Sequence, residues 1–164
     1  MKIKALPSIT LAILVFSLVN SHHLFRSWFN TPIENFSGLI FFLWILPLPV
    51  FWFCKSKQEN PWTTANTFLS WLYLLFGLIS IVTSLNAIAY VGLAFACSTL
   101  IPWLPVNYFW LIASISWMPA FGWYLTHQFP QVPIISLSIF RIILAVSGSL
   151  LVLYKLTMVK KSYE

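Results

Sequence analysis

Three side chains in this sequence could carry out chemistry together: the thiol of Cys97, the guanidinium of Arg141 and the imidazole of His127. A thiol acts as a nucleophile when a neighbouring cation or base stabilises the thiolate, and Arg141 would provide that cation if the two segments touch. An arginine can also bind a substrate oxyanion, and His127 is the candidate proton acceptor because one short loop separates it from the Arg141 segment. One hypothesis therefore assigns catalytic roles to all three residues.

Each of these residues also has a structural interpretation that needs no catalysis. Cysteine in an apolar segment packs as a small apolar side chain. Arg141 lies in the apolar run SIFRII, so it must either face the interior of a helix bundle or extend to a membrane surface about 10 Å away. His127, like the adjacent His22 and His23, fits a polar position at a membrane boundary, and these histidines lack the spacing of a metal site. Both interpretations stay open at this point.

Acidic residues are too few and too scattered for several classes of active site. The sequence has no Asp, and Glu34, Glu59 and Glu164 all lie outside the apolar runs. We therefore expect no paired catalytic carboxylates, no carboxylate metal site and no buried acid of a proton-coupled transporter. The motifs of zinc proteases, serine hydrolases, phosphate-binding loops and haem attachment are also missing, so the sequence predicts no metal and no cofactor.

The net charge of +6 does not indicate a nucleic-acid partner. Nucleic-acid binding needs Lys and Arg gathered on one face. In this chain the nine basic residues occur one to three at a time between apolar runs. We expect them to set the orientation of the chain in a membrane, and we expect no nucleic acid to bind.

A long stretch of the sequence, residues 60 to 140, contains no Asp, Glu, Lys or Arg. This stretch indicates the kind of helix that positions the candidate residues. About a quarter of an average soluble protein is charged, whereas this chain is 7% charged and 60% hydrophobic. A membrane helix needs roughly 20 apolar residues, so the stretch is long enough for several spans. The sequence therefore predicts one all-α integral membrane domain over residues 1–164, with lipids around it.

Apolar runs predict a polytopic bundle of about six transmembrane helices. Their approximate ranges are 5–20, 36–54, 67–85, 87–101, 108–125 and 134–156. Pro47 and Pro49 should kink the second helix, where neighbouring helices can bond the freed backbone groups, and Pro119 should bend the fifth. The first helix either remains in the protein, which we favour, or is a cleaved signal peptide.

The basic residues predict the orientation of this bundle. With six spans and a cytoplasmic N-terminus, seven lysines fall on the cytoplasmic side and Arg26 alone lies in an outer loop. This distribution follows the positive-inside rule. Both termini are therefore expected in the cytoplasm, and the expected location is the cell membrane, as a multi-pass protein of the bacterial inner membrane.

Small residues four positions apart predict close contacts between helices. The pairs are Ser80 with Ser84, Gly92 with Ala96, and Ala145 with Ser149. In lipid, such pairs let two backbones approach each other. Ordinary packing within the bundle is sufficient to explain them.

Two stretches resemble the exosortase and archaeosortase family of multi-spanning membrane proteins. In one alignment, FACSTL at Cys97 is similar to the family's Ala-Cys-Ser-Gly nucleophile motif, and VPIISLSIFRII is similar to a later helix with Asn-x-x-Arg. The resemblance implies processing or sorting of exported proteins that carry a C-terminal tag, with Cys97 as nucleophile and Arg141 as oxyanion or substrate ligand. The chain departs from the family at Thr99, which replaces Gly, and at Ser138, which replaces Asn.

In a second alignment the chain resembles only the N-terminal half of that family, through SLNAIAYVGLAFA and FWLIASISWMP. It would then be a truncated, non-catalytic relative without a nucleophile. A function of a different class, a non-enzymatic membrane scaffold or accessory subunit, needs no catalytic group at all. The expected partner is accordingly another membrane protein or an exported protein with a C-terminal tag.

Overall fold

The computed structural model describes residues 15, 18–19, 21–28, 32–54, 71–72, 75–76, 78–79, 82–83, 85–98, 100–101 and 105–161. Every regular element among these residues is an α-helix or a 3-10 helix, so the predicted all-α class is confirmed for them. The chain forms two compact units. Unit 1 comprises Met1–His23 and Asn60–Trp103, and unit 2 comprises Leu24–Glu59 and Leu104–Glu164.

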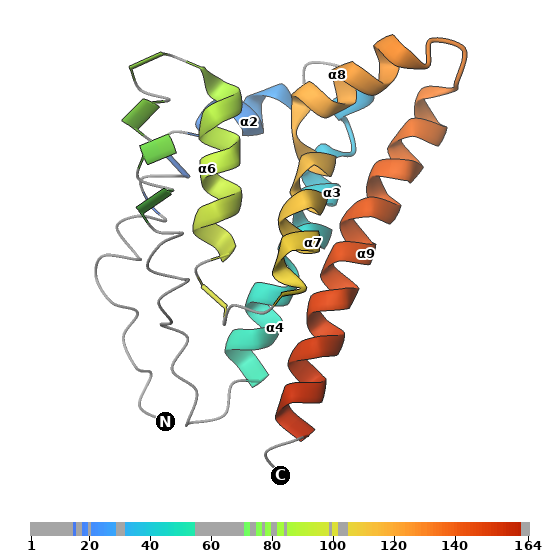
Figure 1. The fold of residues 1–164 in the computed structure, drawn as a ribbon. Helices are drawn as coiled ribbons and strands as arrows, with labels where there is room; N and C mark the ends of the chain where they lie inside the picture. The colour runs from blue at the N-terminus through green and yellow to red at the C-terminus, as the bar shows by residue number, and fades with distance from the viewer. Residues whose placement is uncertain are drawn as a thin grey trace. The chain divides into compact units, whose positions relative to one another are not determined.

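Unit 2 is organised around α9 (Ile134–Lys161), against which most of its other helices pack. These are the 3-10 helix η1 (Pro32–Glu34), α3 (Ser37–Ile45), α4 (Pro47–Cys54), α7 (Asn107–Ala113), the 3-10 helix η2 (Ser114–Trp117) and α8 (Pro119–Gln128). Figure 1 shows α3 and α7 alongside α9, and α8 running obliquely across their end. The first and last thirds of the chain therefore build one core.

The predicted second helix, 36–54, is divided at Leu46 into α3 and α4. Pro47 has no N–H, so it cannot bond the carbonyl of Leu43 as a helix residue would. The hydroxyl of Ser149, on α9, donates to that carbonyl at 2.8 Å and to the carbonyl of Trp44 at 2.9 Å. The helix is thus interrupted where the sequence predicts a kink, and a neighbouring helix bonds the backbone group that the proline frees.

The predicted fifth helix, 108–125, is also interrupted. It consists of α7, η2 and α8, and the break falls at Met118, whose backbone is extended (φ −76°, ψ 131°). Pro119 follows as the first residue of α8, a position where its missing N–H costs no helical hydrogen bond. The residue before a proline is disfavoured in the helical region, and at Met118 this preference ends the helix instead of bending it.

Three buried tryptophans form the centre of unit 2: Trp44, Trp110 and Trp117. The rings of Trp44 and Trp110 stack with their centroids 4.7 Å apart. Each indole N–H donates to the backbone carbonyl of the other residue, at 2.8 and 2.7 Å. Buried indole N–H groups need such acceptors, and this reciprocal pair joins α3 to α7.

Small residues on α9 permit the close approach of neighbouring helices, as the sequence predicts for Ala145 and Ser149. Both side chains are buried. Gly148 lies beside them, and a Cβ atom there would come within 2.5 Å of the Cβ of Ala113 on α7. The backbones of α7 and α9 are therefore closer than any larger residue at position 148 would allow.

Unit 1 contains α6 (Asn86–Ser98), which corresponds to the predicted helix 87–101. Leu93, Ala96 and Cys97 of α6 are buried, and Phe95 stacks on Phe76 at 5.5 Å. The described residues from 71 to 83 are helical, within the predicted range 67–85. Most of the predicted first helix, 5–20, and both Ser80 and Ser84 lie outside the described residues.

Two segments among the described residues are long and apolar enough to cross a membrane, judged by length and composition. They are Pro32–Phe51, with a mean hydropathy of 1.6, and Ile134–Met158, with a mean hydropathy of 2.1. Both belong to unit 2. The helix Asn86–Ser98 is apolar but shorter than a span.

Candidate functional site

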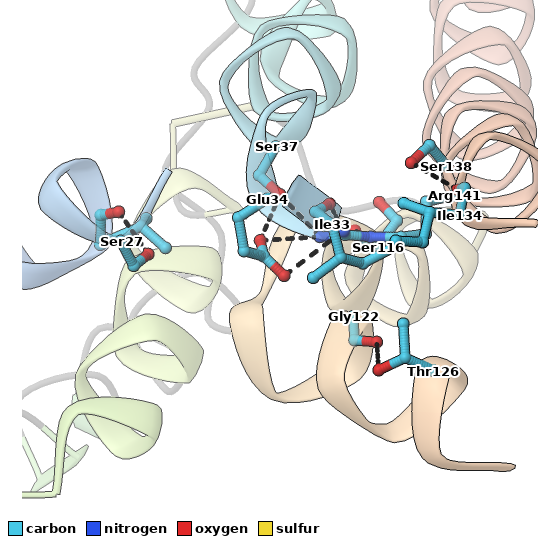
Figure 2. A network of polar contacts seen from close by, with 11 residues as sticks. Ser27, Ile33, Glu34, Ser37, Ser116, Gly122, Thr126, Ile134, Ser138 and Arg141 are labelled. Atoms are coloured by element: carbon cyan, nitrogen blue, oxygen red, sulfur yellow. Dashed lines mark hydrogen bonds and ion pairs between the residues drawn. The ribbon is translucent and has the colours of Figure 1, made fainter. Parts of the chain in front are cut away.

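The most polar place in the interior of unit 2 is built around Arg141, in the third turn of α9. The side chain of Arg141 is 0% exposed, so it does not extend to any surface. It forms an ion pair with Glu34, which is 3% exposed, with 3.2 Å between Nη2 and Oε2. The two residues are 107 positions apart in the chain. Figure 2 shows the pair between α3, η2 and α9.

All five N–H groups of the Arg141 guanidinium have acceptors. Nε donates to the carbonyl of Ser116 at 2.6 Å. Nη1 donates to the carbonyl of Ile33 at 2.8 Å and to Oε1 of Glu34 at 3.4 Å. Nη2 donates to Oε2 of Glu34 at 3.2 Å and to the hydroxyl of Ser37 at 2.8 Å. Because a guanidinium has only five donors, none is left to bind a substrate in this arrangement.

The carboxylate of Glu34 is held by a second side chain as well. The hydroxyl of Ser37, one turn further on, donates to Oε2 of Glu34. Ser37 therefore accepts from Arg141 and donates to Glu34 at the same time. A buried charge pair is stable when its remaining lone pairs and protons are bonded in this way.

The two carbonyls that bond Arg141 are available because short 3-10 helices end near them. In a continuous α-helix the Ser116 carbonyl would accept from residue 120, but the extended backbone of Met118 ends η2 before that bond can form. Ile33 lies in η1, a single turn of only three residues. The breaks in the helices thus provide backbone acceptors for a buried cation.

Gly122, in α8, provides the space for the ion pair. A Cβ atom at this position would collide with Oε1 of Glu34 and would lie 2.9 Å from Nη1 of Arg141. No larger residue fits unless the carboxylate moves.

Gly122→Ala is expected to destabilise the folded protein by about 1–3 kcal/mol, because the added methyl group overpacks the ion pair. Titration with a denaturing detergent, followed by circular dichroism of the micelle-solubilised protein, measures the change. Gly38→Ala is the matched control, since its Cβ would meet only the ring of Trp28, at 3.1 Å. A Gly122→Ala protein as stable as wild type would show that the pair is not confined in this way.

The residues assigned catalytic roles are distributed over both units. Cys97 is a buried free thiol on α6 of unit 1, whereas Arg141 and His127 belong to unit 2. His127 is exposed on α8 and stacks on Trp123 with 5.4 Å between the ring centroids. The hydrogen bonds of the Arg141 guanidinium go to Ser116, Ile33, Glu34 and Ser37, and none of them goes to His127. The catalytic role of the three residues stays a prediction.

His22 and His23, expected at a polar position of a membrane boundary, belong to α2 (His22–Ser27) and are exposed. Their rings lie 3.7 Å apart, and Nδ1 of His22 is 2.9 Å from the carbonyl of Val19. Among the described residues, no group of three or more His, Cys, Asp or Glu side chains is placed to hold a metal ion.

Glu34 is the residue that sequence reasoning missed. The sequence places Glu34 just before the apolar run 36–54 and gives it no role, but the structure buries it. A signal was present, because the chain has one arginine inside an apolar run and a single acid next to one. Opposite charges that both leave water are expected to pair, and this rule would have pointed from Arg141 to Glu34.

The chain was compared with family models, curated proteins and solved structures, and none of them matches it.

Proposed function

We propose that the chain is a multi-pass membrane protein of six spans, with both termini in the cytoplasm, that serves as a non-enzymatic accessory subunit or scaffold of a partner membrane protein. The uncharged stretch 60–140, the two candidate spans of unit 2 and the distribution of lysines support its place in a membrane. On this reading its location is the cell membrane of a bacterium.

One observation supports the non-enzymatic part of the proposal: every N–H donor of the Arg141 guanidinium is already hydrogen-bonded. A catalytic arginine directs its donors at the position where charge develops in the transition state. Here all five donors go to Glu34, Ser37 and two backbone carbonyls inside unit 2. An arginine used in this way stabilises the fold of a membrane bundle and leaves the chain without its candidate oxyanion ligand.

The alternative is an exosortase-like processing protein in which Cys97 attacks a tagged, exported substrate. The two proposals make opposite predictions for Cys97→Ala. An accessory subunit does not use the thiol, and alanine replaces a buried cysteine with little change in volume, so its function should be retained. A processing enzyme should lose all activity, because the covalent intermediate cannot form.

The experiment compares a deletion strain of the native host with strains that express wild type, Cys97→Ala or Cys97→Ala/His127→Ala. Membrane proteins are quantified and the intact masses of exported proteins are measured. We expect the deletion to lower the level of one membrane protein, the partner, and all three chains to restore it. Exported proteins that keep their C-terminal tags in the deletion and in Cys97→Ala would establish the alternative. A deletion that changes neither measurement would overturn both proposals.

A further inference from the structure

The outward surface of α9 in unit 2 is apolar over a length that matches a bilayer. Its exposed large apolar residues between the two ends are Ile135, Ile139, Phe140, Ile143, Leu150 and Leu151. The only charged residue in this part of the helix is Arg141, which is buried. Tyr154 is exposed, and the exposed Lys155 follows it. The part of this surface that carries no charge therefore ends at a tyrosine and a lysine.

The distance along α9 from Tyr154 back to Ile135 is 19 residues, or about 28 Å at 1.5 Å per residue. The hydrocarbon core of a bilayer is about 30 Å thick. If Tyr154 and Lys155 lie at one boundary of the hydrocarbon, the opposite boundary lies near Ile135. That is the end of α9 at which the chain arrives from α8.

The helix α8 has the composition and placement of a segment at that second boundary. Its residues Gly122 and Leu125 are buried, whereas Trp123 is 67% and Tyr124 51% exposed. Phe129, at the start of the link to α9, is 51% exposed. Tryptophan and tyrosine gather where an apolar ring can enter lipid while its polar edge stays in the headgroup layer.

The length and direction of α8 agree with this placement. Its 10 residues extend about 15 Å, half the thickness of the hydrocarbon. The extended backbone at Met118 separates α8 from the preceding helix, and Figure 1 shows α8 oblique to α9. A short helix turned away from the spans and bearing aromatic side chains outward fits a membrane surface better than a membrane interior.

We propose that α8 lies in the headgroup layer of a lipid bilayer, with Trp123 and Tyr124 directed at the lipids, and that Tyr154 marks the opposite layer. The inference deepens the proposed membrane function and rests on it. Lipid is the occupant because the exposed rings of Trp123 and Tyr124 and the exposed ring of Tyr154 are separated by about one bilayer thickness of apolar surface. The predicted helix 108–125 is then divided into α7 and η2, which pack against α9, and the interfacial helix α8.

Spin labels at three exposed positions test the placement: Tyr124→Cys, Ile143→Cys and Tyr154→Cys, each in a Cys54→Ser/Cys97→Ala background. The purified full chain is reconstituted without any partner in vesicles of phosphatidylcholine and phosphatidylglycerol. Collisions with oxygen, which enters hydrocarbon, are compared with collisions with a nickel chelate, which stays in water. We expect the ratio of oxygen collisions to nickel-chelate collisions to be highest for the label at Ile143 and lower at both tyrosine positions.

Two other results at Tyr124 would contradict the placement of α8, and one result at Ile143 would contradict the membrane function. A ratio at Tyr124 as high as at Ile143 would place α8 in the hydrocarbon and overturn the inference. A ratio at Tyr124 as low as that of a label free in buffer would show that α8 lies in water, outside the headgroup layer. This result would also overturn the inference. A label at Ile143 open to the nickel chelate would overturn the membrane function itself.

A second measurement keeps both native cysteines. The emission of Trp123 is obtained as the difference between wild type and Trp123→Phe, in vesicles with lipids brominated at a shallow or a deep position of the acyl chain. We expect stronger quenching by the shallow bromines. Stronger quenching by the deep bromines would contradict the placement of α8 in the headgroup layer.

Discussion

Arg141→Met is expected to destabilise the folded protein by about 3–5 kcal/mol, because it leaves the Glu34 carboxylate buried without its partner. The carbonyls of Ser116 and Ile33 also lose their donor. Glu34→Met should cost a similar amount, since it leaves a buried guanidinium without a countercharge. Unfolding by a denaturing detergent, followed by circular dichroism and tryptophan fluorescence, measures both changes.

The double variant Glu34→Met/Arg141→Met separates the ion pair from ordinary packing. A buried pair replaced on both sides by apolar residues is often close to neutral in stability. We therefore expect the double variant to be more stable than either single variant, with a coupling energy between the two positions. Losses that simply add would show that Glu34 and Arg141 do not depend on each other.

Trp110→Ala should destabilise unit 2 by about 3–5 kcal/mol, the usual cost of truncating a buried tryptophan. The change removes the stack with Trp44 and the hydrogen bond from the Trp110 indole to the carbonyl of Trp44, whereas the backbone carbonyl at position 110 can still accept from the Trp44 indole. Thermal unfolding in detergent micelles, followed by circular dichroism, measures the loss. The matched control is Trp123→Ala, because Trp123 is exposed on α8 and its truncation should be nearly neutral.

Trp110→Phe distinguishes the hydrogen bonds from the stacked ring. Phenylalanine keeps most of the apolar surface but has no N–H for the carbonyl of Trp44. Ser149 still donates to that carbonyl, so the cost of the lost bond should be about 0.5–1.5 kcal/mol. A Trp110→Phe protein as unstable as Trp110→Ala would contradict the assignment of most of the effect to ring packing.

The five N–H donors of the Arg141 guanidinium all bond to groups within unit 2. Arg141 connects α9 with η1, α3 and η2, segments that are distant in sequence. We infer that the cost of burying Arg141 in an apolar helix is offset inside unit 2 and that its role is to hold the last helix in place.

Local patterns in the sequence were sufficient for the helical class of the described residues and for two breaks in the helices of unit 2. The apolar composition predicts the all-α class, and Pro133 precedes the start of α9 at Ile134, where the sequence places it. Pro47 marks the division of α3 from α4, because a proline removes an N–H whatever surrounds it. The small residues Ala145 and Ser149 mark a packing face for the same reason, since size is a property of the residue itself.

Only the tertiary structure decided which side chains meet. Whether Arg141 reaches a cavity, a membrane surface or an acid depends on η1 and η2, and Gly122 leaves the space that lets Glu34 approach. Helix formation depends on contacts three and four residues apart, which a sequence displays directly. The pairing of residues 107 positions apart depends on how whole helices pack, and many packings share the same local pattern.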